Sequence, residues 1–152
     1  MTNYKLTQNT IRVIKEPTAH EITTQIKSSE TAANLFRELY SIVNEDVGVR
    51  ECFFALYLNR ANKVISFSLI SAGGISATFV DPKIIFKAAI DNLANSIILC
   101  HNHPSGTLYP STEDLDITKK IKGACDFFDM RLLDHIILTD NNYYSFADNG
   151  DI

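Results

Sequence analysis

The stretch of sequence that decides the fold runs from Ser96 to Asp114 and reads SIILCHNHPSGTLYPSTED. Its first five residues, 96–100, are mostly apolar and indicate a short buried strand. A proline and a glycine follow within residues 101–106, so the chain is expected to turn there. Ser111 suits the N-cap of a helix, because its side chain can accept a hydrogen bond from the first turn. The stretch therefore predicts a buried strand that ends in a loop and leads into a helix.

Two histidines and one acidic residue in this stretch suggest a metal site. His101 and His103 are two residues apart at the end of the predicted strand, so their side chains should point to the same side. Asp114 follows Ser111 by three residues, in the first helical turn, where the two can form a capping interaction. Two imidazoles and one carboxylate leave a fourth position open, as in catalytic zinc sites. Calcium and magnesium prefer oxygen ligands, so we expect Zn²⁺ as the cofactor.

The rest of the chain alternates between helix and strand patterns. An apolar stripe predicts a helix from Ser28 or Ser29 to about Val43, and Asp81-Pro82 is a strong start for a second helix. Predicted helices cover about 28–43, 82–94 and 111–128, and predicted strands cover about 51–58, 64–70, 75–80, 96–100, 132–138 and 143–147. Hairpins mixed with βαβ-like crossings indicate an α/β (α+β) fold, with a mixed sheet flanked by helices.

One domain accounts for most of the 152 residues. We place it at residues 28–152 and treat residues 1–27 as an N-terminal extension. Within the extension, the sequence TIRVIKE at residues 10–16 alternates weakly and is a possible edge strand, which Pro17 would end.

Composition and charge exclude several classes of protein. The chain has 14 Lys+Arg and 18 Asp+Glu, a net charge of -4, so it lacks the basic surface of a protein that grips nucleic acid through phosphates. No apolar run is long enough to span a membrane, and the start MTNYKLTQNT has no secretion signal. The 3 cysteines form no CxxC pair, which fits reduced, buried thiols. We therefore expect a cytoplasmic protein with no membrane association, and nucleic acid is an unlikely partner for this chain alone.

The spacing His-x-His, seven residues, Ser, two residues, Asp resembles the JAMM signature of the MPN (JAB) fold. The segments HNHPSG, PSTEDLDITKKI, LLDHIIL and YYSFAD are similar to the bacterial RadC family in particular. This similarity covers residues 28–152. RadC proteins usually carry a further N-terminal helical region, for which this chain has no room, so we expect a JAB domain alone.

The resemblance implies a set of functional residues. His101, His103 and Asp114 match the family's zinc ligands. Glu51, at the start of CFFALYL, best matches the upstream glutamate that acts as general base, and Ser111 matches the serine that stabilises the developing oxyanion. The implied activity is that of a metalloprotease-like hydrolase that cleaves amide or isopeptide bonds. Its partner would be a peptide or protein substrate, which the sequence does not identify, and the oligomeric state is also open.

Other interpretations of the same residues remain. Glu51 can instead be a surface acid beside Arg50, and Ser111 only a helix cap. His135 can support the metal ligands from behind, but we favour a structural imidazole within the sheet. The whole protein can be a metal-dependent nuclease, in keeping with the DNA-repair label of RadC proteins, or a non-catalytic binding module. A cysteine hydrolase using Cys100 beside His101 is disfavoured, because neighbours in a strand face opposite ways.

Overall fold

The computed structural model describes residues 24–73 and 79–152. Their helices are α2 (Ser29–Ile42), α3 (Pro82–Asp91), α4 (Thr112–Phe127) and the short α5 (Phe146–Asn149). Their strands are β1 (Cys52–Leu58), β2 (Val64–Ala72), β3 (Ser96–Asn102), β4 (Arg131–Leu138) and β5 (Tyr143–Ser145). Within these ranges, no helix has the length and apolar character needed to cross a bilayer.

The five strands form one mixed sheet in the order β2-β1-β3-β4-β5. β1 pairs antiparallel with both β2 and β3, and β4 pairs antiparallel with β5. β3 and β4 are parallel, and α4 crosses over between them. The predicted mixed sheet flanked by helices is therefore confirmed.

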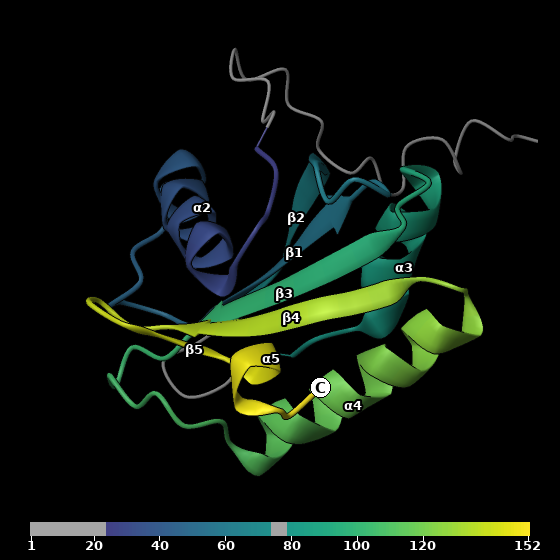
Figure 1. Ribbon diagram of the computed structural model, residues 1–152. Helices are drawn as coiled ribbons and strands as arrows, with labels where there is room; N and C mark the ends of the chain where they lie inside the picture. The colour runs from purple at the N-terminus through teal and green to yellow at the C-terminus, as the bar shows by residue number, and fades with distance from the viewer. Residues whose placement is uncertain (1–23, 74–78) are drawn as a thin grey trace, which may run out of the picture.

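Helices cover both faces of the sheet, and each face has its own apolar layer. α2 packs on one face, against alternate residues of β1, β3 and β4 such as Phe54 and Ile98. α3 and α4 pack on the opposite face, against the intervening residues such as Phe53 and Leu99 (Figure 1). β1 and β3 are thus buried on both sides, which is why their sequences are nearly continuous apolar runs.

Most predicted elements are confirmed, and the differences occur at element ends. α3 stops at Asp91, three residues before the predicted end, because Leu93 adopts a positive φ that breaks the helix. Leu93 is consequently 83% exposed. The last predicted strand is cut after Ser145, whose hydroxyl accepts a hydrogen bond from Asp148 and so caps α5 instead. The possible edge strand at 10–16 and most of the predicted strand 75–80 lie outside the described residues.

The crossover β3-α4-β4 brings the chemically interesting residues together. β3 lies at the centre of the sheet and delivers His101 at its end, and α4 begins ten residues after β3 ends. Because odd-numbered residues of β3 face α3 and α4, the side chain of His101 points toward the layer that contains α4.

Candidate metal centre

His101, His103 and Asp114 converge, as their spacing predicts. One ligand atom from each side chain lies within 4.8 Å of the other two. His101 Nε2 is 3.0 Å from His103 Nε2 and 3.1 Å from Asp114 Oδ1, and His103 Nε2 is 3.4 Å from Asp114 Oδ2. His101 is almost completely buried, while His103 and Asp114 are partly open to solvent. The cluster is therefore anchored at its base and accessible at its rim.

These separations fit a zinc ion. In a tetrahedral shell with Zn–N and Zn–O bonds of about 2.0–2.1 Å, neighbouring ligand atoms lie about 3.3 Å apart. The three distances in this cluster are close to that value. The donor set of two imidazoles and one carboxylate also suits zinc better than magnesium or calcium.

The side chain of His103 has the tautomer that a metal ligand needs. Its Nδ1 lies 2.7 Å from the backbone carbonyl of Thr107, and a carbonyl oxygen can only accept a hydrogen bond. Nδ1 therefore carries the proton and donates it. In the neutral ring, the lone pair of Nε2 then faces the cluster.

Asp114 is oriented by the start of α4. Its Oδ2 accepts a hydrogen bond from the backbone N–H of Ser111, and the Ser111 hydroxyl accepts one from the backbone N–H of Asp114. This reciprocal pair is a capping box, so the expected capping interaction is confirmed. Because Oδ2 is held by the backbone, Oδ1 is the oxygen turned toward His101.

Electrostatics tie the cluster together. Burial would raise the pKa of Asp114, but its interactions with the imidazoles of His101 and His103 outweigh burial and hold that pKa well below its usual value. Burial would likewise lower the pKa of His103, but hydrogen bonds with Asp114 and the Thr107 carbonyl outweigh it and raise that pKa. The carboxylate thus remains ionised beside two imidazoles, as expected of a metal ligand.

Glu51 lies on the same side of the sheet as the cluster. In the β1–β3 ladder Phe53 pairs with His101 and their rings stack, so Glu51, two residues earlier, faces the same way as Phe53. Burial raises the pKa of Glu51, His101 and His103 draw it back down, and Asp114 raises it further. Glu51 is therefore a half-buried acid in the electrostatic field of the cluster.

Arg50 has Glu45 as its ion-pair partner. Its guanidinium forms an ion pair and hydrogen bonds with Glu45, at the surface between α2 and β1. Glu51 is the sequence neighbour of Arg50 but is half-buried, which disfavours the alternative of a surface acid beside Arg50. The hydrogen bond with Arg50 lowers the pKa of Glu45. Glu45 is therefore a weaker proton acceptor than Glu51, whose pKa is raised.

One side chain holds the backbone on both sides of Glu51. Asn102 lies between the two histidines in sequence but points to the opposite face, where it is fully buried. Its Nδ2 donates to the carbonyl of Arg50 at 2.8 Å, and its Oδ1 accepts from the N–H of Cys52 at 2.7 Å. The same amide donates to the carbonyl of Val47 and accepts from the hydroxyl of Tyr40. Both peptide groups that flank Glu51 are thereby fixed relative to β3.

His135 contacts the cluster, which corrects the structural interpretation favoured from the sequence. Its Nε2 lies 2.8 Å from His101 Nδ1, and its Nδ1 lies 2.6 Å from the hydroxyl of Thr118. The parallel β3–β4 register explains the contact, because it places His135 beside Leu99, with its side chain on the same face as His101. Burial holds the pKa of His135 well below its usual value, and neighbouring His101 lowers it further.

The cysteine hydrolase interpretation is wrong. Cys100 faces the α2 side of the sheet, opposite to His101, and it is completely buried in that apolar layer. Burial raises the pKa of its thiol well above the usual value, so no nucleophilic thiolate forms there. Cys52 and Cys125 are also free and buried.

The model of a known family matches residues 26–151, most of the chain, and its description is RadC-like JAB domain. The chain belongs to this family. The chain is also similar to curated proteins named only UPF0758 protein. One from Flavobacterium johnsoniae is 47% identical over 116 residues, covering 75% of this chain and 51% of the relative. One from Streptococcus sanguinis is 41% identical over 103 residues, covering 68% of this chain and 45% of the relative.

A third UPF0758 protein, from Chlorobium chlorochromatii, is 37% identical over 131 residues, covering 86% of this chain and 58% of the relative. The JAB domain of this chain therefore spans about half the length of the curated relatives it matches. The name of these relatives assigns them no substrate.

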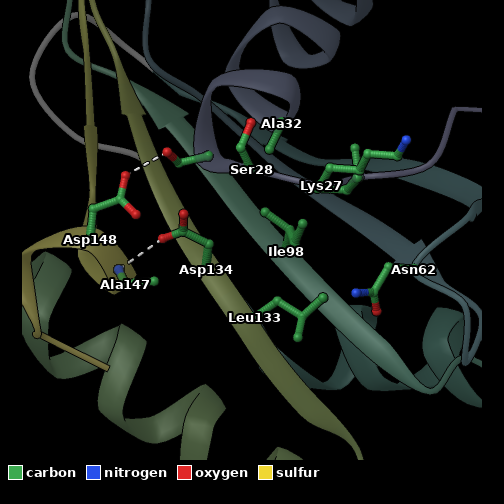
Figure 2. A pocket seen from close by; sticks show the side chains of 11 residues that line it. Lys27, Ser28, Ala32, Asn62, Ile98, Leu133, Asp134, Ala147 and Asp148 are labelled. Atoms are coloured by element: carbon green, nitrogen blue, oxygen red, sulfur yellow. Dashed lines mark hydrogen bonds between the residues drawn. The ribbon is translucent and has the colours of Figure 1, made fainter.

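A separate hollow of about 200 Å³ lies on the other face of the JAB domain, between the start of α2 and the strands β3 and β4. Figure 2 shows two carboxylates in it, Asp134 and Asp148. Asp134 accepts a hydrogen bond from the Ala147 N–H, and Asp148 accepts one from the Ser29 hydroxyl (Figure 2). Asp134 also accepts a hydrogen bond from the Ser145 hydroxyl. Both carboxylates thus hold α5 in place, and none of the cluster residues lines this hollow.

The sequence did not lead us to predict the roles of Thr118 and Asn102. Thr118 lies four residues after Asp114, so both are on one face of α4, and this spacing was a usable signal. Asn102 was hidden within the His-x-His motif, because strand alternation directs attention to the face of the histidines. Its position as a polar residue in an otherwise apolar strand facing α2 was the only sign of its role.

Proposed function

We propose that the protein is a zinc-dependent hydrolase of the JAMM type, which cleaves amide bonds in a peptide or protein substrate. The proposal rests on one geometric observation: two imidazoles and a carboxylate with zinc-like spacing share a face of the sheet with the half-buried Glu51. Zinc, when bound, supplies Lewis acidity that polarises a carbonyl and makes water nucleophilic near neutral pH.

The side chains around the cluster supply the remaining chemistry. Glu51 takes a proton from the attacking water and later gives it to the leaving amine, a task that suits a carboxyl whose pKa is raised by burial. The Ser111 hydroxyl accepts its capping hydrogen bond through a lone pair, so its own hydrogen can be donated to the developing oxyanion. His101, His103 and Asp114 hold the metal at the open rim of the site.

The charge of the chain favours a protein substrate over nucleic acid. The net charge is -4, and in α4 the lysines at 119, 120 and 122 share the helix with acidic residues. Lys122 forms a salt bridge with Asp126, one helical turn away. Metal-dependent nucleases typically use a carboxylate-rich site that binds two metals. This cluster instead has one carboxylate and two imidazoles.

The experiment that tests the proposal is the substitution Glu51→Gln, with metal content and hydrolysis measured on the same preparations. Gln keeps the size of Glu but cannot accept a proton as a carboxylate does. We expect about one zinc per chain in both proteins, and hydrolysis slowed about 10²–10⁴-fold in the variant. The assay is a panel of peptides and isopeptide-linked proteins, with nucleic acids in parallel.

Glu45→Gln is the matched control, because Glu45 is paired with Arg50 outside the cluster. It should keep both zinc and hydrolysis. A Glu51→Gln protein as active as the wild type would remove Glu51 from the mechanism. Zinc-dependent cleavage of nucleic acid alone would favour the nuclease alternative, and bound zinc with no cleavage in any assay would favour a binding module.

A further inference from the structure

A chain of hydrogen bonds, which we call the relay, connects His101 to Asp114 on the side of His101 that faces away from the other two cluster residues. It starts at His101 Nδ1, passes through the ring of His135 and the hydroxyl of Thr118, and ends at the backbone carbonyl of Asp114. The three distances are 2.8, 2.6 and 2.6 Å. Thr118 is 2% exposed and His135 is fully buried, so water does not compete for these bonds.

The direction of the chain is fixed at its Asp114 end. A backbone carbonyl can only accept, so the hydroxyl of Thr118 donates its single hydrogen to Asp114. The lone pairs of that hydroxyl are then left for His135 Nδ1, which must carry a proton and donate it. His135 Nε2 consequently presents a lone pair to His101.

The same direction is required at the other end. Because His135 Nε2 accepts, His101 Nδ1 must carry a proton and donate it. In a neutral ring this leaves the lone pair on His101 Nε2, the nitrogen that faces His103 and Asp114. His103 reaches the same state by one direct bond to the Thr107 carbonyl, whereas His101 needs two intermediate side chains.

We propose that Thr118 and His135 are positioning residues, which lock His101 in the Nδ1–H tautomer and thereby prepare Nε2 to bind zinc. This inference rests on the zinc site of the proposed function. The fixed direction of the relay orders the ring of His101 before metal arrives, and its return to Asp114 ties the two ligands to each other. Such supporting hydrogen bonds typically change metal affinity by about 10–100-fold.

The test uses Thr118→Val, which keeps the shape of the side chain but removes the hydroxyl. Thr118→Ser is the matched control, because it restores the hydroxyl with one methyl group fewer. We expect the zinc dissociation constant to rise about 10–100-fold in Thr118→Val and to remain close to wild type in Thr118→Ser. Far-UV circular dichroism of both variants checks that they are folded.

A second readout does not depend on any variant. Nitrogen-15 NMR of the histidine rings in the zinc-loaded wild type should show His135 protonated at Nδ1 and bare at Nε2. Protonation of His135 at Nε2, or an unchanged zinc affinity in folded Thr118→Val, would overturn the relay while leaving the zinc site intact. A wild type that binds no zinc would overturn the metal site itself, and the relay with it.

Discussion

At the scale of single residues, the buried Asn102 side chain bonds to three backbone groups. Its amide makes four hydrogen bonds, to Tyr40, Val47, Arg50 and Cys52, which use its full donor capacity and both lone pairs of its oxygen. Removing it would leave several buried polar groups without a partner. Each such group costs about 1–3 kcal/mol when water cannot replace the lost bond.

We therefore expect Asn102→Ala to lower the free energy of unfolding by about 2–4 kcal/mol, measured by chemical denaturation. Asn149→Ala is the matched control, because Asn149 is exposed and its side chain makes one hydrogen bond, to the Ser145 carbonyl. It should cost less than about 1 kcal/mol. Equal losses in the two variants would show that the hydrogen bonds from Asn102 to residues 47–52 contribute little to the free energy of unfolding.

The residues of the site differ in how far they could be predicted. His101, His103 and Asp114 are close in sequence, and strand alternation with one helix start is enough to bring them together. Glu51 comes from a different strand, so only the family resemblance pointed to it. Thr118 and His135 meet only because α4 crosses over between two parallel strands, and the sequence does not specify the angle or depth of that crossing.

At the scale of elements, the helices α3 and α4 begin with similar N-caps. Ser111 caps α4 and accepts from the N–H of Asp114, while Asp81 caps α3 and accepts from the N–H of Lys83. The caps differ in one respect: only that of α4 is bonded to a cluster residue.

Ser111→Ala and Asp81→Ala should each lower the free energy of unfolding by about 0.5–2 kcal/mol, because each removes one N-cap. Zinc affinity should fall only in Ser111→Ala, since that variant loosens Asp114. Thermal denaturation and zinc titration of both variants measure the two effects. Loss of zinc affinity in Asp81→Ala as well would mean that general destabilisation, not the orientation of Asp114, weakens the site.

The elements themselves were mostly visible in the sequence, and the exceptions have local causes. α3 was expected to reach about residue 94, but Asn92 ends the helix and Leu93 takes a left-handed conformation. The final strand was expected to reach Ala147, but Ser145 offers the backbone a capping bond in place of a ladder bond. In both cases a polar residue at the boundary outweighs the apolar pattern.

At the scale of the whole molecule, the apolar layers on the two sides of the sheet do not depend on metal. His101→Ala and Asp114→Ala should therefore lose zinc and remain folded. A chelator should likewise leave the circular dichroism spectrum of the wild type unchanged while lowering its thermal midpoint. The stabilisation lost is about 2.7 kcal/mol for zinc at a hundred times its dissociation constant. Cooperative unfolding upon chelation would contradict a catalytic site and indicate a structural one.

The position of β3 has a consequence for how the site opens. β3 is the central strand and is buried along its whole length, so its amides belong to the part of the molecule that opens only with global unfolding. Asp114 instead sits in the first turn of α4, where two residues before it are exposed and fraying needs little free energy. The carboxylate can thus swing away and return while the imidazole of His101 stays in place. This gives an ion a route in and out that leaves the sheet closed.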